Sequence, residues 1–489
     1  MKVVIIGGGV AGLTAGVYAR KAGWEVALYE KNALVGGECT GWDRQGFHID
    51  NCAHWIMGMR PGTALYEVWC ENGAVSDGVE LLRSDHMYTS ELGGERVTLW
   101  ADEARTRREL HALSPEDGDA IDELLDDALA ARSIEIPAEK PPELMGAADS
   151  LKMAVRMRQA LRLFRKYRGM DTTDVKNRFR HPLLRAMISD FCPTVMGGYA
   201  FPMMYGNFLS GDGGTPRGGS RAMALRMGQR LEALGGRICT RAPVARLVVE
   251  DNRVQRALLE SGESVEGDYF ICACDPDFTF HHLLDPSYMD EMFRTVYRER
   301  ETYPVFGMFQ TAFAVDCPDD LLGGDVMLDC AELCDQPWQS KRLTVWTCAH
   351  QPEFAPPGHQ VLQAIWFMSE AGWDFWSALG AEEYRARKNE YAARVQRKIE
   401  ARWPGYAGRL RLLDSWTPVT YRRWCNAYKG YNQAYVATKH ARENPYPQAW
   451  IPGLDNALHA GQWLSAPGGL CGAATQGKFA VQRIQARQK

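Results

Sequence analysis

The 489-residue sequence lacks several features that would assign it to a class of proteins at once. It contains no uninterrupted stretch of 18 apolar residues, so we expect no membrane-spanning helix. It has 56 Lys and Arg against 61 Asp and Glu, and a net charge of −5 supplies no basic field for nucleic acid. Its 13 cysteines include no C-x-x-C pair. These absences exclude the simplest membrane, nucleic-acid and zinc-ribbon interpretations.

The start of the chain and the cysteine spacing predict a cellular compartment. The first apolar run is broken by glycines and has no small-residue cleavage pattern, so we expect no signal peptide and a cytoplasmic protein with reduced thiols. Cys272 with Cys274 and Cys330 with Cys334 lack a histidine or a second pair at zinc spacing, so we expect no metal site. The length is too great for one core and predicts two domains.

Residues 3–31 contain the clearest motif. An apolar run over 3–6 predicts a buried parallel strand, and Gly7, Gly9 and Gly12 then follow the G-x-G-x-x-G spacing. A helix that begins near Val10 and Ala11 would direct its N-terminus at a pyrophosphate. A second strand over 25–29 ends at Glu30 and Lys31, where the Glu30 carboxylate can accept hydrogen bonds from both ribose hydroxyls. The unit predicts a dinucleotide site, and a purely structural glycine turn is the alternative.

Residues 36–58 carry a resemblance to a known family. Gly36 and Gly37, then Thr40 and a hairpin that ends in Asp50, resemble the second signature of the FAD-containing amine oxidase and phytoene desaturase superfamily. By this resemblance, Gly36, Gly37 and Thr40 line the cofactor. Relatives often have Arg after the glycine pair, whereas this chain has Glu38. Because an acid cannot neutralise phosphate, the phosphates must depend more on the helix dipole, backbone N–H groups or another cation.

Residues 459–484 resemble the closing segment of the same superfamily. A strand ends at Gly461, a Pro-Gly-Gly turn follows, and a helix begins near Gly472. This second strand, glycine turn and helix implies a composite site for FAD rather than for NAD alone. The cofactor-binding residues expected in this segment are Gly461, Gln462, Gly468, Gly469, Leu470 and Gly472.

The remaining segments define the predicted domains. Residues 215–276 read as a helix, a stop at Gly235 and strands with turns near 251 and 261, and by resemblance Val244 contacts the adenine. An ordinary β-meander is the alternative. We therefore predict an α/β protein with a Rossmann-type FAD-binding domain, in which an α+β substrate-binding domain is inserted. The FAD-binding domain comprises 1–70, 215–285 and 446–489, and the substrate-binding domain comprises 71–214 and 286–445.

The two insertions are rich in methionine and aromatic residues, which suit core packing first but also a wall around a long apolar ligand. The helix expected over 381–402 and the segment 414–430 resemble phytoene desaturases, carotenoid isomerases and their bacterial relatives. No second nucleotide fingerprint is evident, so electrons are expected to leave to oxygen, a quinone or another diffusible acceptor. For an acid or base we consider His54 and Tyr428, each of which has a purely structural role as the alternative.

Three functions remain open at this point. The first is an FAD-dependent oxidoreductase that desaturates or saturates an apolar, polyene-like or lipid-like small molecule. The second is a redox-neutral double-bond isomerase that uses the same flavin. The third is a flavin-free prenyl-binding chaperone of the same fold, which the retained glycines and Glu30 disfavour.

Residues 151–169 contain seven basic residues and no acidic residue. At helical spacing, Met153, Met157, Leu161 and Phe164 fall on one side, and Lys152, Arg156, Arg158, Arg162 and Lys166 fall mostly on the other. We expect either a surface helix with solvated charges or a peripheral contact with an anionic membrane at the mouth of an apolar tunnel.

Overall fold

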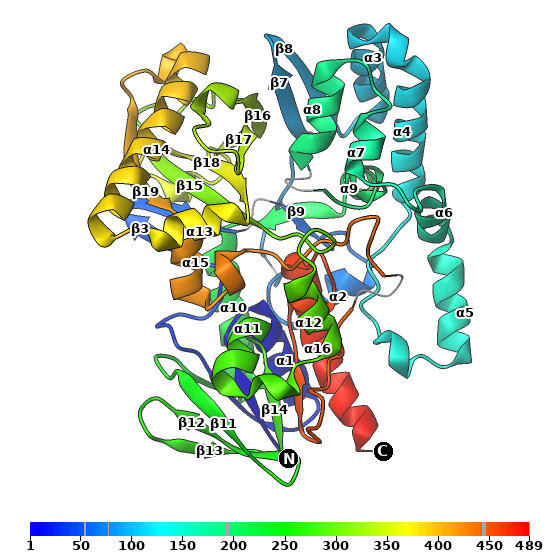
Figure 1. The fold of residues 1–489 in the computed structure, drawn as a ribbon, viewed down its shortest axis with the longest axis vertical. Coiled ribbons are helices and arrows are strands. Elements are labelled where there is room, and N and C mark those ends of the chain that lie inside the picture. The colour runs from blue at the N-terminus through cyan, green and yellow to red at the C-terminus, as the bar shows by residue number, and fades with distance from the viewer. Residues whose placement is uncertain (53–54, 77, 192–194, 443–445, 489) are drawn as a thin grey trace.

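The structure is a computed structural model, and it describes residues 1–52, 55–76, 78–191, 195–442 and 446–488. Figure 1 shows both described ends of the chain in the lower part of the molecule. A large sheet and a group of helices form the upper part. Segments that are far apart in the sequence meet in each part, and the site lies where the two parts join.

A five-stranded parallel sheet forms the centre of the lower part. Its β1 strand, Lys2–Ile6, is apolar on both faces because both faces are covered. Val3 and Ile5 pack toward the helices, whereas Val4 and Ile6 pack toward a second, antiparallel sheet. The strand order is β10 (Arg237–Cys239), β2 (Glu25–Tyr29), β1, β14 (Tyr269–Cys272) and β20 (Ala457–His459).

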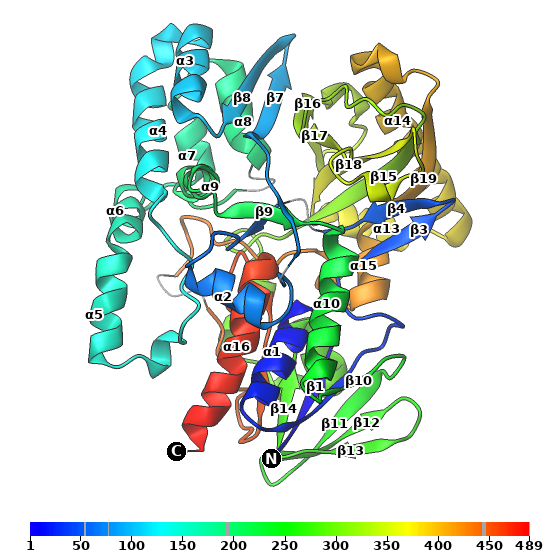
Figure 2. The same ribbon diagram turned by 180° about the vertical axis from the view of Figure 1, so that it is seen from behind.

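Three long helices cover one face of this sheet, as Figure 2 shows from behind. They are α1 (Val10–Lys21), α10 (Gly219–Ala233) and α16 (Gly469–Arg487). The other face is covered by an antiparallel sheet and two helices, namely β11 (Val244–Glu250), β12 (Arg253–Leu259), β13 (Ser264–Glu266), α11 (Pro276–Phe278) and α12 (Glu291–Arg298). This three-layer arrangement confirms the predicted α/β class.

A seven-stranded sheet forms most of the upper part. Its strands pair antiparallel except for β16 and β7, which run parallel and join the two long insertions. Helix α14 covers one face, and the β3–β4 hairpin packs against the other. The sheet order is β19 (Leu410–Trp416), β15 (Phe306–Val315), β18 (Gln360–Ser369), β17 (Gln339–Thr347), β16 (Val326–Asp329), β7 (His86–Leu92) and β8 (Glu95–Trp100).

The other elements surround these sheets. Beside the large sheet lie the hairpin β3 (Gly41–Arg44) and β4 (Phe47–Asp50), with α13 (Ala371–Ala378), α14 (Ala381–Arg402) and α15 (Pro418–Cys425). A separate group of helices comprises α3 (Glu103–Leu113), α4 (Gly118–Ala131), α5 (Ala147–Arg156), α6 (Arg158–Lys166), α7 (Thr172–Lys176), α8 (Pro182–Phe191) and α9 (Ala200–Leu209). Between the two parts lie β5 (Ile56–Met57), α2 (Ala64–Glu71), β6 (Leu81–Leu82) and β9 (Gly213–Pro216).

Most of the expected elements are present. The helix over 381–402 is confirmed, as are the strands and turns between 237 and 272. The single helix expected over 151–169 is wrong, because it breaks at Met157 into α5 and α6. Helix α6 buries Ala160 and Leu163 against the helical group, whereas α5 buries no residue. The domain boundaries stay a prediction. Within the described ranges, no helix combines the length and apolar character needed to cross a bilayer.

Candidate functional site

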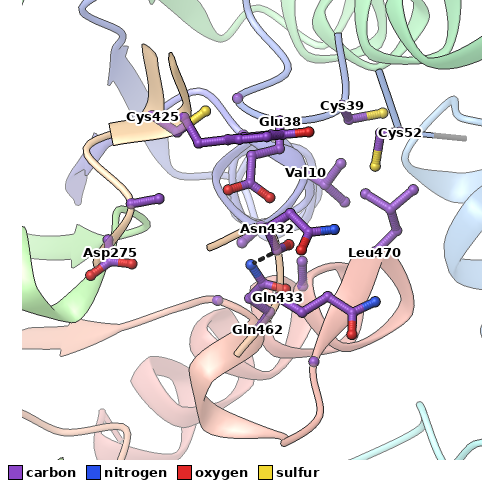
Figure 3. Close-up of a pocket in the computed structure, with 18 of the residues that line it drawn as sticks. Val10, Glu38, Cys39, Cys52, Asp275, Cys425, Asn432, Gln433, Gln462 and Leu470 are labelled. Atoms are coloured by element: carbon purple, nitrogen blue, oxygen red, sulfur yellow. Dashed lines mark hydrogen bonds between the residues drawn. The ribbon is translucent and has the colours of Figure 1, made fainter. Parts of the chain in front are cut away.

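A cavity of about 640 Å³ lies at the carboxyl ends of β1, β2 and β14. Figure 3 shows side chains that enter it from segments far apart in the sequence. Parallel α/β sheets bind ligands at this edge, because helix N-termini and connecting loops meet there. Most of the predicted cofactor residues line it, namely Gly7, Gly9, Val10, Ala11, Glu30, Lys31, Gly36, Gly37, Glu38, Val244, Gly461, Gln462, Gly468, Gly469 and Leu470.

The glycines between β1 and α1 shape the first part of the cavity. Gly7 has a φ of +103°, and a Cβ there would lie 2.7 Å from the carbonyl oxygen of Ala273. A Cβ on Gly9 would meet only the carbonyl oxygen of Gly36, at 3.9 Å, so this position opens to the cavity. Gly9 is also the N-cap of α1 and supplies no side-chain acceptor to its first N–H groups. These N–H groups can therefore bind a phosphate.

Glu30 is fixed by the backbone around it. Its side chain is 5% exposed, and its two oxygens accept hydrogen bonds from the N–H groups of Gly8 and Asn32, both at 2.8 Å. A carboxylate oxygen can accept more than one hydrogen bond, so both oxygens retain capacity for ribose hydroxyls. The structure thus adds a second role, because Glu30 also holds the glycine turn in place.

The C-terminal glycine turn supplies a second helix N-terminus. Gly468 is the N-cap of α16 and makes no side-chain cap. The Gln462 side chain accepts a hydrogen bond from the Gly469 N–H at 2.9 Å. It also donates one to the Asn432 carbonyl at 3.4 Å, which Figure 3 shows as a dashed line. In the part of the chain that the structure describes, no atom beyond the adjoining residues and the helix's own backbone lies within 4 Å of a Cβ built on Gly461 or Gly469. Two open helix N-termini on one cavity fit a long dinucleotide such as FAD.

Two carboxyl groups in the cavity lie in surroundings that disfavour their ionised form. Burial, and then the charge of Asp275, raise the pKa of Glu38 well above its ordinary range. Burial also raises the pKa of Asp275 to about 7, although its carboxylate accepts hydrogen bonds from the N–H groups of Tyr428 and Asp277. Lys31 is the cavity's basic side chain among the described residues, and its Nζ is committed to the Arg423 carbonyl and the Asn426 side chain.

Apolar side chains from the upper part line the remaining wall. Met308 and Ile365 are buried residues from neighbouring strands of the large sheet. The wall consists of Trp55, Ile56, Met57, Met196, Met204, Phe306, Met308, Ile365 and Phe367. At its edge, the Tyr421 hydroxyl donates to the Asn51 side chain at 2.9 Å, and the Trp416 ring N–H donates to the same oxygen at 2.9 Å. The cavity therefore joins a polar cofactor region to an apolar region.

Several predicted residues lie behind the lining or away from it. Gly12 packs α1 against the turn, since a Cβ there would lie 2.0 Å from the Gly7 carbonyl oxygen. Thr40 is buried and Gly472 packs on Ser465, and neither lines the cavity. The Tyr428 ring packs at a tilt of 54° against the Tyr297 ring, with centroids 4.7 Å apart, and Tyr428 is not a lining residue either. His54 lies outside the described residues, so the catalytic roles of His54 and Tyr428 stay predictions.

The sequence reasoning missed several lining residues. Asp275 lies three residues after the end of β14, so the rule that parallel strands present their carboxyl ends to ligands could have found it. Asn51, Tyr421, Asn432 and Gln433 come from a hairpin, a helix and a loop, and no local pattern marks them. Their meeting depends on long-range packing.

Comparisons with known proteins agree with this geometry. The sequence model of the family described as "Flavin containing amine oxidoreductase" matches residues 10–485. This match confirms the resemblance inferred from the motifs at the two ends of the chain. The members of this family use FAD, and the two open helix N-termini, the glycine cradle and Glu30 fit that cofactor.

Among curated proteins, a zeta-carotene-forming phytoene desaturase from Myxococcus xanthus is 28% identical over 308 residues, 58% of this chain and 55% of that protein. A 4,4'-diaponeurosporene oxygenase from Staphylococcus aureus is 25% identical over 325 residues, 64% of this chain and 63% of that protein. The chain thus spans 55% and 63% of the length of these two relatives.

Solved structures share the fold over the whole chain. An oxidoreductase from Methanosarcina mazei has a TM-score of 0.58 at 17% identity, covering 99% of this chain and 100% of that chain. A cyclohexylamine oxidase from Brevibacterium oxydans has a TM-score of 0.57 at 14% identity, covering 100% and 99%. At these identities the likeness establishes the fold and leaves the substrate open.

Proposed function

The chain belongs to the family of flavin containing amine oxidoreductases, which are FAD-dependent oxidoreductases, and we propose that its substrate is apolar and polyene-like or lipid-like. The proposed reaction moves a hydride between the flavin and a C–H or C=C centre of this substrate. A diffusible acceptor, such as oxygen or a quinone, then takes the electrons. The names of two curated relatives, which refer to phytoene and diaponeurosporene, support this substrate class.

The apolar wall beside the cofactor region is the observation that carries the proposal. Of its nine residues, none is charged, and methionine and aromatic side chains predominate. Such side chains adapt to a long hydrocarbon without a fixed polar partner. A small cationic amine is favoured by a carboxylate partner, whereas the nine residues of this wall include none.

Most of the protein's groups bind and position the cofactor and the substrate. In a desaturation, the proton that leaves with the hydride passes to solvent or to a base, for which His54 and Tyr428 stay the predicted candidates. When bound, FAD supplies the hydride chemistry. The two helix N-termini and Glu30 hold the cofactor, while the apolar wall excludes water and aligns the hydrocarbon beside it. Burial raises the pKa of Tyr421 well above its ordinary range, so its hydroxyl stays neutral and keeps the hydrogen bond to Asn51. This bond links the hairpin to the wall.

The substrate class is tested by anaerobic mixing of the purified flavoprotein with candidate molecules. A polyene precursor in detergent micelles should reduce the flavin and bleach its visible absorbance, while putrescine and cyclohexylamine should leave it oxidised. Met204→Asp should slow the bleaching because it charges the wall, and Met204→Leu should preserve it. Bleaching by amines alone contradicts the proposal. Conversion of the polyene without bleaching or acceptor consumption identifies the isomerase alternative.

We also propose that α5 and α6 rest on an anionic lipid surface, through which a water-insoluble substrate reaches the cavity. Leu151, Val155 and Leu161 are 69%, 62% and 50% exposed. Lys152, Arg158, Arg162 and Arg165 are exposed beside them, and their side chains make no hydrogen bond or ion pair to the described residues. Exposed apolar and unpaired basic side chains together favour a negatively charged interface.

Helix α6 lies close to the apolar end of the cavity. Phe164 of α6 contacts Tyr199, with ring centroids 4.6 Å apart, and the lining residues Met196 and Met204 lie on either side of Tyr199 in the sequence. In Figure 1 both helices run along the outer edge of the molecule, with α6 nearer to α9 and α5 further down. The division into an apolar and a basic face differs from the one expected from the sequence. Leu161 of the expected apolar side is exposed, and Arg156 of the expected basic side pairs with Glu139.

The membrane contact is tested by sedimentation with anionic liposomes. Replacement of Arg158, Arg162 and Arg165 by Gln should reduce binding at low salt, at about 1 kcal/mol per charge, without loss of FAD. Lys166 is left in place because it pairs with Glu123 and Asp127. A control with the same charge change replaces the exposed residues Arg246, Arg253 and Arg385. Equal binding by both variants, or no binding by the wild type, contradicts the proposal.

A further inference from the structure

Glu38 directs an acid into a cavity that must hold a pyrophosphate. It follows Gly37, and a Cβ built on Gly37 would lie 3.3 Å from the Cα of Gly9, the N-cap of α1. Glu38 therefore belongs to the end of the cavity at which phosphate binds. Its carbonyl oxygen accepts hydrogen bonds from the Asn51 side chain and the Thr40 N–H, both at 2.9 Å. Because these bonds fix the backbone, the side chain remains in the cavity, as Figure 3 shows.

Among the described residues, the titratable groups that interact with Glu38 supply no positive charge. Four titratable groups interact electrostatically with the Glu38 carboxyl group, namely Asp275 after β14, Tyr421 and Cys425 on α15, and Cys52 after β4. All of them are neutral or negative, and burial raises the pKa of each. The other charged lining residues are Glu30, Lys31 and Glu260, and the Nζ of Lys31 is bound elsewhere.

The pyrophosphate of FAD carries two negative charges. An ionised Glu38 beside it would add like-charge repulsion in a buried site, where little solvent screens the charges. A proton on Glu38 removes that repulsion and also converts the side chain from an acceptor into a donor that a phosphate oxygen can use. Burial already favours the neutral form before FAD binds, because the pKa of Glu38 is raised.

We propose that this chain binds FAD with Glu38 as a neutral carboxylic acid, so that alkaline pH weakens FAD binding through this one residue. The inference rests on FAD as the cofactor and concerns only how the cofactor is held. The proton comes from solvent and stays on the carboxyl group while FAD is bound. If the pKa of Glu38 is higher in the FAD complex than in the FAD-free protein, the affinity for FAD is constant below the pKa of the FAD-free protein. Above that pKa the affinity falls by up to about tenfold per pH unit.

Infrared spectroscopy of the FAD-bound protein tests the protonation directly. At about pH 7.5, the wild type should show the carbonyl band of a buried carboxylic acid, and this band should disappear in Glu38→Gln. Asp275→Asn is examined in parallel, because the pKa of Asp275 is also raised, to about 7. A band that keeps its full intensity in Glu38→Gln but disappears in Asp275→Asn, or a spectrum without any such band, overturns the proposal.

FAD titrations of the deflavinated protein measure the consequence. The Glu38→Gln amide also donates a hydrogen bond and cannot ionise, so it should bind FAD as tightly as the wild type at about pH 6 and more tightly at about pH 9. Glu266→Gln is the matched control, because Glu266 is exposed on β13 and does not line the cavity, and it should follow the wild type.

Two further results would contradict the inference while leaving FAD binding intact. If EDTA releases FAD and magnesium restores it, a cation rather than a proton neutralises the site. If Glu38→Gln loses FAD at every pH although its FAD-free form melts at the wild-type temperature, the ionised carboxylate is required. Neither result would alter the family assignment or the proposed substrate class.

Discussion

Replacement of Glu30 by Ala separates cofactor binding from loop stability. The Glu30 carboxylate accepts hydrogen bonds from the N–H groups of Gly8 and Asn32, and the side chain is 5% exposed. If it also accepts the ribose hydroxyls, its loss removes charge-assisted hydrogen bonds worth about 1.5–3 kcal/mol. The dissociation constant for FAD should then rise by about 10- to 150-fold.

The same substitution should also lower the Tm of the FAD-free protein, because two buried N–H groups lose their acceptor. Fluorescence titration of the deflavinated protein measures the first effect, and calorimetry measures the second. Glu25→Ala is the control on the same strand, since the Glu25 side chain is 69% exposed and should affect neither. Unchanged FAD affinity in Glu30→Ala, together with a lower Tm, would refute the ribose contact.

Three further substitutions follow from local geometry. Gly9→Ala should weaken FAD retention with little change in the Tm of the FAD-free protein, because the one atom near its Cβ among the described residues lies 3.9 Å away. Gly12→Ala should instead destabilise the fold by about 1–3 kcal/mol, because its Cβ would lie 2.0 Å from a backbone oxygen. Melting with and without FAD distinguishes the two effects. Burial lowers the pKa of His459 to about 3, so its contribution to stability is complete above about pH 6.5 and is lost as pH falls toward about 3. In urea unfolding, His459→Phe should therefore lose less stability on acidification than the wild type, by up to about 1.4 kcal/mol per pH unit. An unchanged pH dependence would contradict this. Arg342→Met should destabilise the protein by about 3–5 kcal/mol, because it leaves the buried Asp190 carboxylate without its partner; equal stability of the two proteins would count against this ion pair.

The sequence predicted the parts of the site that depend on neighbouring residues. The β1–α1–β2 unit could be predicted because its strand, glycines, helix and terminal Glu30 lie within one short stretch of sequence. Each part of this stretch has a known role in dinucleotide binding. The C-terminal turn could be read for the same reason. In both cases the local pattern and the fold require the same backbone conformation.

The parts that could not be predicted depend on contacts between distant segments. The parallel pairing of β16 with β7 joins residues near 90 to residues near 327, and no local pattern encodes it. The break at Met157 arises because α6 packs against the helical group while α5 does not. Likewise, Asp275 and Glu38 come from separate loops, and the sequence does not predict that they lie near each other. Their proximity raises the pKa of Glu38, the residue at which this chain departs from the family motif.

The central claim is that the flavin of this protein exchanges a hydride with a long apolar chain. The most direct test is an anaerobic single turnover with a polyene precursor, in which reduced flavin and product are counted together. We expect one flavin reduced for each new carbon–carbon double bond, with the product identified by chromatography and mass spectrometry. A flavin that stays oxidised with every polyene tested, but is reduced by a small amine, would contradict the account.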